Sequence, residues 1–291
     1  MPPIVNAPIV NAMSVDIEEY FQVGAFEHTI DRSAWDAIAS RVEFNTQAVL
    51  DLYAGAGVKA TFFTLGWVAE RHPALIRRIV AEGHELASHG YTHDRVHDLT
   101  PESFRADLRK TKAILEDAGG VPVIGYRAPS FSIGKVNAWA LQVLADEGYA
   151  YSSSVAPFGT DHYGWPGFPR FAHRPVQGSP MIEVPVTTAR FAGRTLAAGG
   201  GGFFRMLPYA FSRWAIAQVN EEERQPAVFY FHPWEVDPGQ PRVAGAPIKS
   251  RLRHYTNLGV MADKLRRVMR DFAWDRMDRV YLGAPAVAAA A

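Results

Sequence analysis

The chain has 291 residues, of which 48% are apolar, and its 30 basic and 30 acidic side chains give a formal net charge of zero at pH 7. This length and apolar content allow one large hydrophobic core, and the lack of a basic field argues against nucleic acid as a partner. The chain contains no cysteine. Disulfides and thiolate metal sites are therefore excluded, and any metal must be held by histidines and carboxylates.

The first twelve residues contain a direct duplication, in which residues 3–7 are repeated as residues 8–12. They lack the basic segment and the long apolar segment of a signal peptide. We expect residues 1–12 to form a flexible N-terminal extension and residues 13–291 to form one domain, with 240–291 as its C-terminal extension. No stretch approaches the about 18 consecutive apolar residues of a transmembrane helix, and we expect a cytoplasmic protein. The oligomeric state stays open.

In chain order, apolar runs typical of strands alternate with helical patterns. Strands are expected at residues 12–15, 58–64, 84–88, 122–126, 149–152, 181–184 and 227–231. Helices are expected at residues 42–54, 73–82, 101–118, 137–147 and 208–222, and an amphipathic stretch at 258–272 predicts a further helix that packs on the rest. This alternation predicts a parallel sheet covered by helices, hence a barrel or a doubly wound sheet.

Two features of the sequence bear on the class of protein: the absence of nucleotide-binding motifs and a pair of histidines. Neither a dinucleotide-binding glycine motif nor a P-loop follows any expected strand, and the glycines at 199–202 lack the Lys-Ser/Thr tail of a P-loop, so we expect a flexible loop there. His89 and His93, four positions apart after the strand at 84–88, have the spacing of two metal ligands. Such pairs also arise by chance, so the interpretation depends on what else converges on them.

Reactive side chains follow several of the expected strands. Asp16 and Glu18 follow the first strand, Arg127 follows the strand at 122–126, and His232 follows the strand at 227–231. In α/β barrels the active site is built at the C-terminal ends of the strands. We therefore expect these side chains to meet the two histidines at one end of a barrel.

These residues carry a family resemblance. Asp16-Ile-Glu18, His89-x-x-x-His93, Arg127-Ala-Pro129 and Phe231-His232 resemble the successive motifs of the polysaccharide deacetylase family, also called NodB-homology or carbohydrate esterase family 4. The phrases at 14–23, 125–132 and 251–255 are similar to a subfamily associated with exopolysaccharide and PEP-CTERM/exosortase gene clusters. The resemblance covers nearly everything after Met13.

The resemblance implies a distorted (β/α) barrel that hydrolyses acetyl groups on sugars with a divalent metal, usually zinc. His89, His93 and Glu18 would be the metal ligands, Asp16 the general base, Arg127 its partner and His232 the general acid. The substrate would be an acetylated oligo- or polysaccharide, namely an exopolysaccharide or its precursor. The oxyanion would be stabilised by the metal and by a backbone N–H near residues 126–130 or in an adjacent loop.

Two positions depart from the family pattern. The first family motif most often has two adjacent aspartates, whereas here Ile17 follows Asp16. Alternation in a strand puts Asp16 and Glu18 on one face, so Glu18 is the expected ligand and Glu19 the alternative. Ser152 stands where the subfamily usually has an aspartate, so an acidic partner is missing there. That substitution is expected to lower activity without removing it.

Several other residues have both structural and functional interpretations. His84 is expected in the core, Glu85 is expected to point away from the site, and His97 with Asp98 is expected in a solvated turn. Five residues could either form a platform for sugar rings or serve ordinary packing: Tyr91, Phe131, Trp165, Trp234 and Glu235. The segment 251–255 either caps the barrel or lines a substrate groove, and a substrate with acidic sugars would favour the groove.

Two further functions are open on the sequence alone. The same apparatus could hydrolyse a small non-sugar amide, as in allantoinase-like relatives, which would require a closed pocket. Alternatively, Ile17 and Ser152 could mark a carbohydrate-binding protein with a degenerate site, which would bind no stoichiometric metal.

Overall fold

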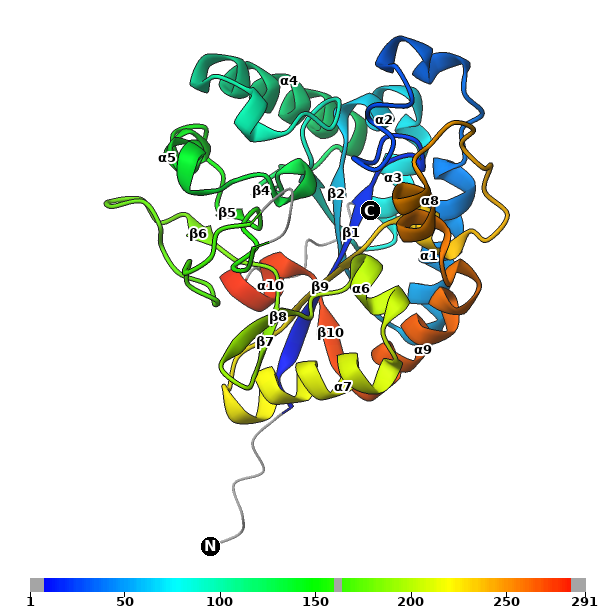
Figure 1. Cartoon of the computed structure of the whole chain (residues 1–291). Helices are drawn as coiled ribbons and strands as arrows, with labels where there is room; N and C mark the ends of the chain where they lie inside the picture. Colours follow the sequence, from blue (N-terminus) through cyan, green and yellow to red (C-terminus); the bar gives the residue numbers. More distant parts are fainter. Residues whose placement is uncertain (1–7, 160–163, 284–291) are drawn as a thin grey trace, which may run out of the picture.

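The computed structural model describes residues 8–159 and 164–283, and within them the chain forms a curled parallel sheet surrounded by helices (Figure 1). Seven of the eight strands of this sheet run in the order β10-β1-β2-β3-β4-β5-β6, and the eighth, β9, also pairs with β1. The strands are β1 (Val10–Ile17), β2 (Thr61–Thr64), β3 (Glu85–Ser88), β4 (Gly125–Tyr126), β5 (Tyr151–Ser152), β6 (Ile182–Glu183), β9 (Val228–Phe231) and β10 (Ala273–Asp275). All seven predicted strands are present, and the predicted distorted (β/α) barrel is confirmed.

Strand β1 is the centre of the sheet because it pairs with three others. Its first residues pair with β10, its middle pairs with β9 and its end pairs with β2. The strand begins at Val10, and Ala12 is fully buried. The prediction that residues 1–12 form a flexible extension is therefore wrong for residues 10–12, since backbone pairing with β10 orders them. Residues 1–7 lie outside the described residues, as do residues 284–291 of the C-terminal extension.

The glycine run closes the barrel between β6 and β9. Ala198 N donates to Thr187 O over 3.1 Å, and Tyr230 N donates to Gly199 O over 2.8 Å. Gly200 has φ +116°, and a Cβ atom there would lie 2.1 Å from Tyr230 O, so only glycine can approach β9 this closely. The expectation of a flexible loop is wrong, because Gly199, Gly200 and Gly201 are buried and Gly200 forms a bridge to Tyr230 of β9.

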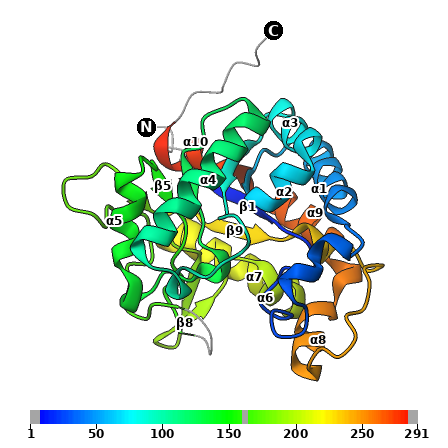
Figure 2. The same ribbon diagram turned by 90° about the horizontal axis from the view of Figure 1, so that it is seen from above.

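Helices cover the outer face of the sheet (Figures 1 and 2). The helices of the described residues are α1 (Val42–Ala56), α2 (Gly66–Arg71), α3 (Pro73–Ala81), α4 (Pro101–Gly119), α5 (Trp139–Asp146), α6 (Gly201–Met206), α7 (Tyr209–Ala217), α8 (Ile248–Tyr255), α9 (Met261–Asp271) and α10 (Met277–Leu282). A π turn, Gln218–Glu222, completes the predicted helix at 208–222. The sequence did not predict α2, α6, α10, β10 or the antiparallel hairpin of β7 (Thr188–Phe191) and β8 (Arg194–Ala197).

Alternation along each strand separates an outer core from an inner one. Phe62 belongs to the large cluster between sheet and helices, whereas its neighbour Phe63 belongs to a smaller cluster with residues of six other segments. Met277, at the start of α10, is part of that smaller cluster, and its backbone N–H bonds to the hydroxyl of Thr61. Thus α10 closes the N-terminal end of the barrel and leaves the C-terminal end for a site. Among the helices of the described ranges, none combines the length and the hydropathy needed to cross a membrane.

Candidate active site

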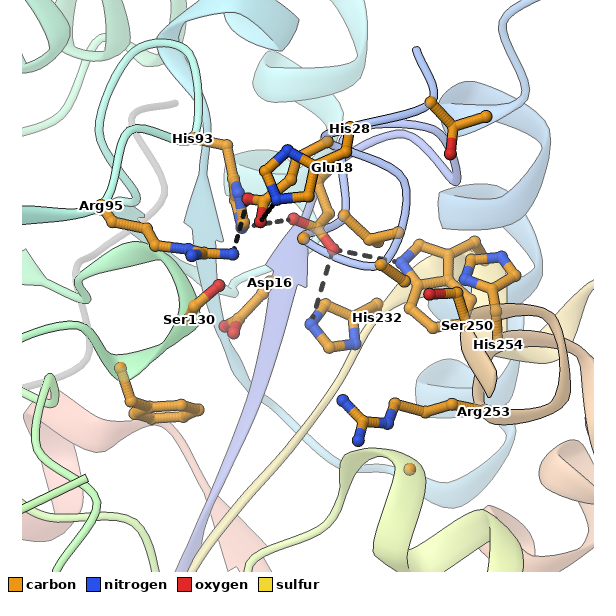
Figure 3. A pocket seen from close by; sticks show the side chains of 18 of the residues that line it. Asp16, Glu18, His28, His93, Arg95, Ser130, His232, Ser250, Arg253 and His254 are labelled. Carbon is orange, nitrogen blue, oxygen red and sulfur yellow. Dashed lines mark hydrogen bonds and ion pairs between the residues drawn. The ribbon is translucent and has the colours of Figure 1, made fainter. Parts of the chain in front are cut away.

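The reactive side chains predicted from the sequence meet at the C-terminal ends of the strands (Figure 3). Asp16 lies near the end of β1 and Glu18 directly follows it, while His89, Arg127 and His232 directly follow β3, β4 and β9. Four of them line one cavity of about 440 Å³ together with His93, and Arg127 lies buried behind Asp16. The expectation that these segments converge is confirmed.

Glu18, His89 and His93 form a cluster with the composition of a metal site. One potential ligand atom from each lies within 4.8 Å of the other two. Glu18 Oε2 is buried and lies 2.9 Å from His93 Nε2, but it has no hydrogen bond of regular geometry. The two histidines come from a loop, in which His93 has φ +60°, and not from a helical turn. Two imidazoles and a carboxylate are ligands suited to zinc.

The hydrogen bond of His89 determines which ring nitrogen faces the cluster. Its Nδ1 lies 2.9 Å from the backbone oxygen of Arg127. A carbonyl oxygen can only accept, so Nδ1 carries the proton and Nε2 is left with a lone pair, as a metal ligand requires. Burial lowers the pKa of His89 to about 4. The imidazole is therefore neutral at physiological pH.

The two adjacent glutamates point in different directions. Burial raises the pKa of Glu18, but the imidazoles of His93 and His232 outweigh burial and lower that pKa to about 2. Glu19 instead turns toward α1, where its carboxylate accepts the backbone N–H groups of Arg41 and Val42 at 3.0 and 3.2 Å. Of the two candidates, only Glu18 faces the histidines, because the pleat of β1 carries Asp16 and Glu18 to one side.

Asp16 and Arg127 form a buried ion pair. Arg127 Nη1 lies 2.6 Å from Asp16 Oδ1 and also donates to Ser14 Oγ, and the rest of the guanidinium donates to the backbone oxygen and hydroxyl of Ser153. The guanidinium also lies 4.0 Å from the ring centroid of Phe63. Arg127 is completely buried, so it can orient Asp16 but cannot contact a substrate.

A second buried ion pair supports His232. Its Nδ1 lies 2.9 Å from Glu235 Oε1, and Glu235 Oε2 accepts a 2.8 Å hydrogen bond from Arg205 Nε. Burial lowers the pKa of His232, but Glu18 and then Glu235 outweigh it and raise that pKa to about 9. Its other nitrogen, Nε2, lies 3.6 Å from Glu18 Oε1. His232 is therefore protonated at physiological pH, with Nε2 toward the cavity.

The C-terminal extension is built into the site. His254 stacks on Trp234 with ring centroids 4.1 Å apart, and Trp234 stacks on His232 at 5.1 Å. The indole N–H of Trp234 donates to Glu18 Oε1. Arg205 donates to the backbone oxygens of Arg253 and His254. The sequence did not point to Arg205, because no local pattern marks an arginine whose partners lie far along the chain.

The missing carboxylate at Ser152 is replaced nearby by Glu183. These two residues pair across β5 and β6, and the buried Glu183 carboxylate accepts the backbone N–H groups of Ser154 and Val155 at 2.8 and 2.9 Å. Ser152 itself bonds to Ser154 Oγ. An acidic group thus lies one strand away from the predicted gap, which the sequence analysis did not anticipate.

Of the residues whose role the sequence left open, some line the cavity or support it and others do not. Phe131 and Trp234 line the cavity and Glu235 supports His232, whereas Tyr91 and Trp165 do not line it. Three further positions lie where they were expected: His84 packs against Phe62, buried Glu85 bonds to Thr61 and Tyr151 under the barrel, and exposed His97 lies beside exposed Asp98. Of the segment 251–255, Arg253 and His254 line the cavity.

Two backbone N–H groups in the segment expected to stabilise the oxyanion already donate hydrogen bonds within the protein. Arg127 N donates to Ser88 O, and Ala128 N donates to Ser154 Oγ. Both therefore shape the turn and are not available to a substrate. Ser130, with φ +55°, is the residue of this segment that lines the cavity together with Phe131.

Two family profiles match adjacent regions of the chain, and residues 1–28 lie outside both. The polysaccharide deacetylase profile matches residues 29–152, and a domain of unknown function, DUF3473, matches residues 153–282. The boundary falls at β5, inside the sheet. Of the site residues, His89, His93 and Arg127 lie in the first match and His232, Trp234 and Glu235 lie in the second, so both matched regions build one site.

Relatives with assigned names identify the family. A chitooligosaccharide deacetylase of Sinorhizobium fredii is 54% identical over 186 residues, which cover 58% of this chain and 80% of that protein. A peptidoglycan-N-acetylglucosamine deacetylase of Bacillus cereus is 37% identical over 84 residues, which cover 29% of this chain and 30% of that protein. The chain belongs to the polysaccharide deacetylase family, although it spans less than half of the length of several of the curated relatives that it matches.

Solved structures agree on the fold. The crystal structure of a polysaccharide deacetylase from Mycobacterium smegmatis superposes with a TM-score of 0.53 at 22% identity, covering 90% of this chain and 94% of that one. The Bc1960 peptidoglycan N-acetylglucosamine deacetylase superposes with a TM-score of 0.50 at 15% identity, covering 95% and 89%. At these identities the likeness concerns the arrangement of the barrel and its helices.

Proposed function

We propose that this protein is a metal-dependent hydrolase that removes acetyl groups from N-acetylated sugars of a polysaccharide or its precursor. The observation that carries the proposal is the convergence, in one cavity, of the cluster Glu18, His89 and His93 with Asp16 on one side and His232 on the other. Membership of the polysaccharide deacetylase family supports the reaction class. The link to exopolysaccharide and exosortase gene clusters and the cytoplasmic location stay predictions from the sequence.

The three clustered residues fit a divalent metal. The neutral Nε2 of His89, the imidazole of His93 and the ionised carboxylate of Glu18 would hold it, most simply as zinc. Such an ion supplies Lewis acidity toward a carbonyl oxygen and toward water, which an unreactive amide needs. Glu18 Oε2 lacks a regular hydrogen bond although it is buried, as expected for a group that serves as a ligand.

The remaining residues move protons. Arg127 occupies Oδ1 of Asp16, so Oδ2 is the oxygen that accepts a proton from the attacking water. His232, whose Nδ1 bonds to Glu235, donates from Nε2 to the leaving amine. Ser130 and Phe131 line the same cavity as Asp16 and His232.

The proposal is tested by metal content and acetate release. Protein purified without chelators is expected to hold about one divalent metal per chain and to release acetate from chito-oligosaccharides, with loss of activity after chelation and recovery with zinc. Asp16→Asn is expected to abolish turnover while metal stays bound. Retained activity in that variant would reject the assignment of the base, and absence of both metal and acetate release would reject the enzyme.

Two observations favour the sugar substrate over the alternatives. The cavity is bordered by His28, whose side chain is 93% exposed, so it opens to solvent as a groove and does not enclose a small amide. The residues that would bind metal and move protons are all present, which argues against a degenerate binding protein. An assay with allantoin and a panel of acetylated glycans discriminates these functions.

A further inference from the structure

One wall of the cavity is formed by helix α8 of the C-terminal extension. Lys249, Ser250, Arg253 and His254 line the cavity, and Lys249 and Arg253 are four positions apart, on one face of the helix. Figure 3 shows Arg253 extending from α8 into the cavity, beside His232. A cavity that binds only a neutral sugar does not require a cationic side chain here, so the presence of Arg253 calls for an explanation.

The acidic groups of the cavity are engaged elsewhere. Asp16 pairs with Arg127, Glu18 faces His93, and Glu27 pairs with Arg95. Within the described ranges, no carboxylate lies within ion-pair distance of the Arg253 guanidinium. Arg253 therefore brings a positive charge to the cavity that the neighbouring protein residues leave uncompensated.

The helix that carries Arg253 is held firmly to the catalytic residues. Arg205 donates to Arg253 O over 3.0 Å and to His254 O over 2.9 Å, and its other side bonds to Glu235, the partner of His232. The ring of His254 stacks on Trp234. The backbone of Arg253 is anchored in this way, so the turn of α8 that carries its exposed side chain stays beside the residues that support His232.

We infer that α8 selects a saccharide carrying an anionic group, a carboxylate or a phosphate, close to the acetyl group that is removed. The inference rests on the proposed function and adds the substrate class. Arg253 contributes a charge-assisted hydrogen bond to that anion, for which a guanidinium is well suited. Arg251, on the same helix, is exposed and does not line the cavity, so it offers a matched control.

The test compares three substrates with wild type, Arg253→Gln and Arg251→Gln. Tetra-N-acetylchitotetraose (hereafter chitotetraose) is neutral, a hyaluronan tetrasaccharide places carboxylates beside each acetylated sugar, and UDP-N-acetylglucosamine carries phosphates. We expect the wild type to have a higher kcat/KM for one of the anionic substrates than for chitotetraose. We expect Arg253→Gln to lower that ratio on the order of tenfold, the value of one charged hydrogen bond, and Arg251→Gln to leave it unchanged. The substrate that responds identifies the anion.

An unchanged ratio in Arg253→Gln, or an equal loss in both variants, would overturn the inference. Calorimetry measures the Kd of the hyaluronan tetrasaccharide and of UDP-N-acetylglucosamine without turnover, so it distinguishes a failure of this inference from a failure of the proposed function. If no substrate releases acetate, the deacetylase proposal fails, yet a Kd that rises on the order of tenfold in Arg253→Gln alone still supports anion recognition. An equal Kd in all three proteins for both ligands overturns it.

Discussion

Replacing Arg127 by methionine removes a completely buried guanidinium while keeping much of its aliphatic volume. Asp16, only 2% exposed, would then be a buried carboxylate without its counter-ion. At the 2.6 Å separation of the pair and an effective dielectric constant of about 20, Coulomb's law gives an attraction of about 6 kcal/mol. Part of this is offset by the desolvation of the guanidinium, so we expect a loss of about 3–5 kcal/mol in the free energy of unfolding.

The assay is a double-mutant cycle followed by urea denaturation, with Asp16→Asn and the combined variant as the other corners. The combined variant leaves no unpaired charge, so it is expected to be more stable than Arg127→Met alone. All three variants are expected to be inactive but to keep bound metal, because the hydrogen bond to His89 comes from the backbone oxygen of Arg127. A loss below about 1 kcal/mol in Arg127→Met, or additive losses in the cycle, would refute a desolvated, coupled pair.

The other predictions concern the metal, a buried carboxyl and the barrel closure. His89→Ala is expected to lose both bound metal and acetate release. Glu19→Gln weakens only the start of α1, so it is expected to keep the metal and to lose about 1 kcal/mol of stability. Elemental analysis measures the metal and urea denaturation the stability, and loss of metal in Glu19→Gln would reverse the ligand assignment. Burial and the neighbouring Asp278 carboxylate raise the pKa of Glu85 to about 8 from 4.5, so its contribution to stability is full below pH 4.5 and is lost as the pH rises through about 8. Glu85→Gln should therefore gain stability relative to wild type across this range, and parallel pH profiles of unfolding would contradict this. Gly200→Ala places a Cβ atom 2.1 Å from a backbone oxygen of β9, and it is expected to lower the free energy of unfolding by about 2 kcal/mol or more. Gly202→Ala is the control, because the nearest atom to its Cβ would be 3.9 Å away. Equal melting temperatures for the two variants would show that the barrel closure tolerates a side chain.

Sequence reasoning located the strands and the residues at their ends because both signals are local. An apolar run ending in Asp16, His89 or His232 can be read within a few positions, and parallel strands bring such ends together. The choice of Glu18 over Glu19 also followed from local alternation along β1, and the two side chains do point in opposite directions.

The missed features depend on distant partners. Arg205 bonds to residues 30 and 49 positions away, so nothing near it in the sequence marks its position. β10 is only three residues long, and its pairing with β1 defines it as a strand. The glycines at 199–202 resembled a loop because their purpose, a close approach to β9, is visible only once the barrel is assembled.

The pairing of β1 with β9 and β10 also determines how this protein can be made. Ala12 pairs with Val228 and Val10 with Ala273, so the first strand to be synthesised is completed by the last two. At about 5–20 residues per second, β1 leaves the ribosome roughly 10–40 s before β9. A chain cut at the boundary between the two matched regions would leave the central strand β1 with an open edge of unpaired backbone groups. Neither half is thus a separate module, and the nascent barrel depends on protection from aggregation until its C-terminal region arrives.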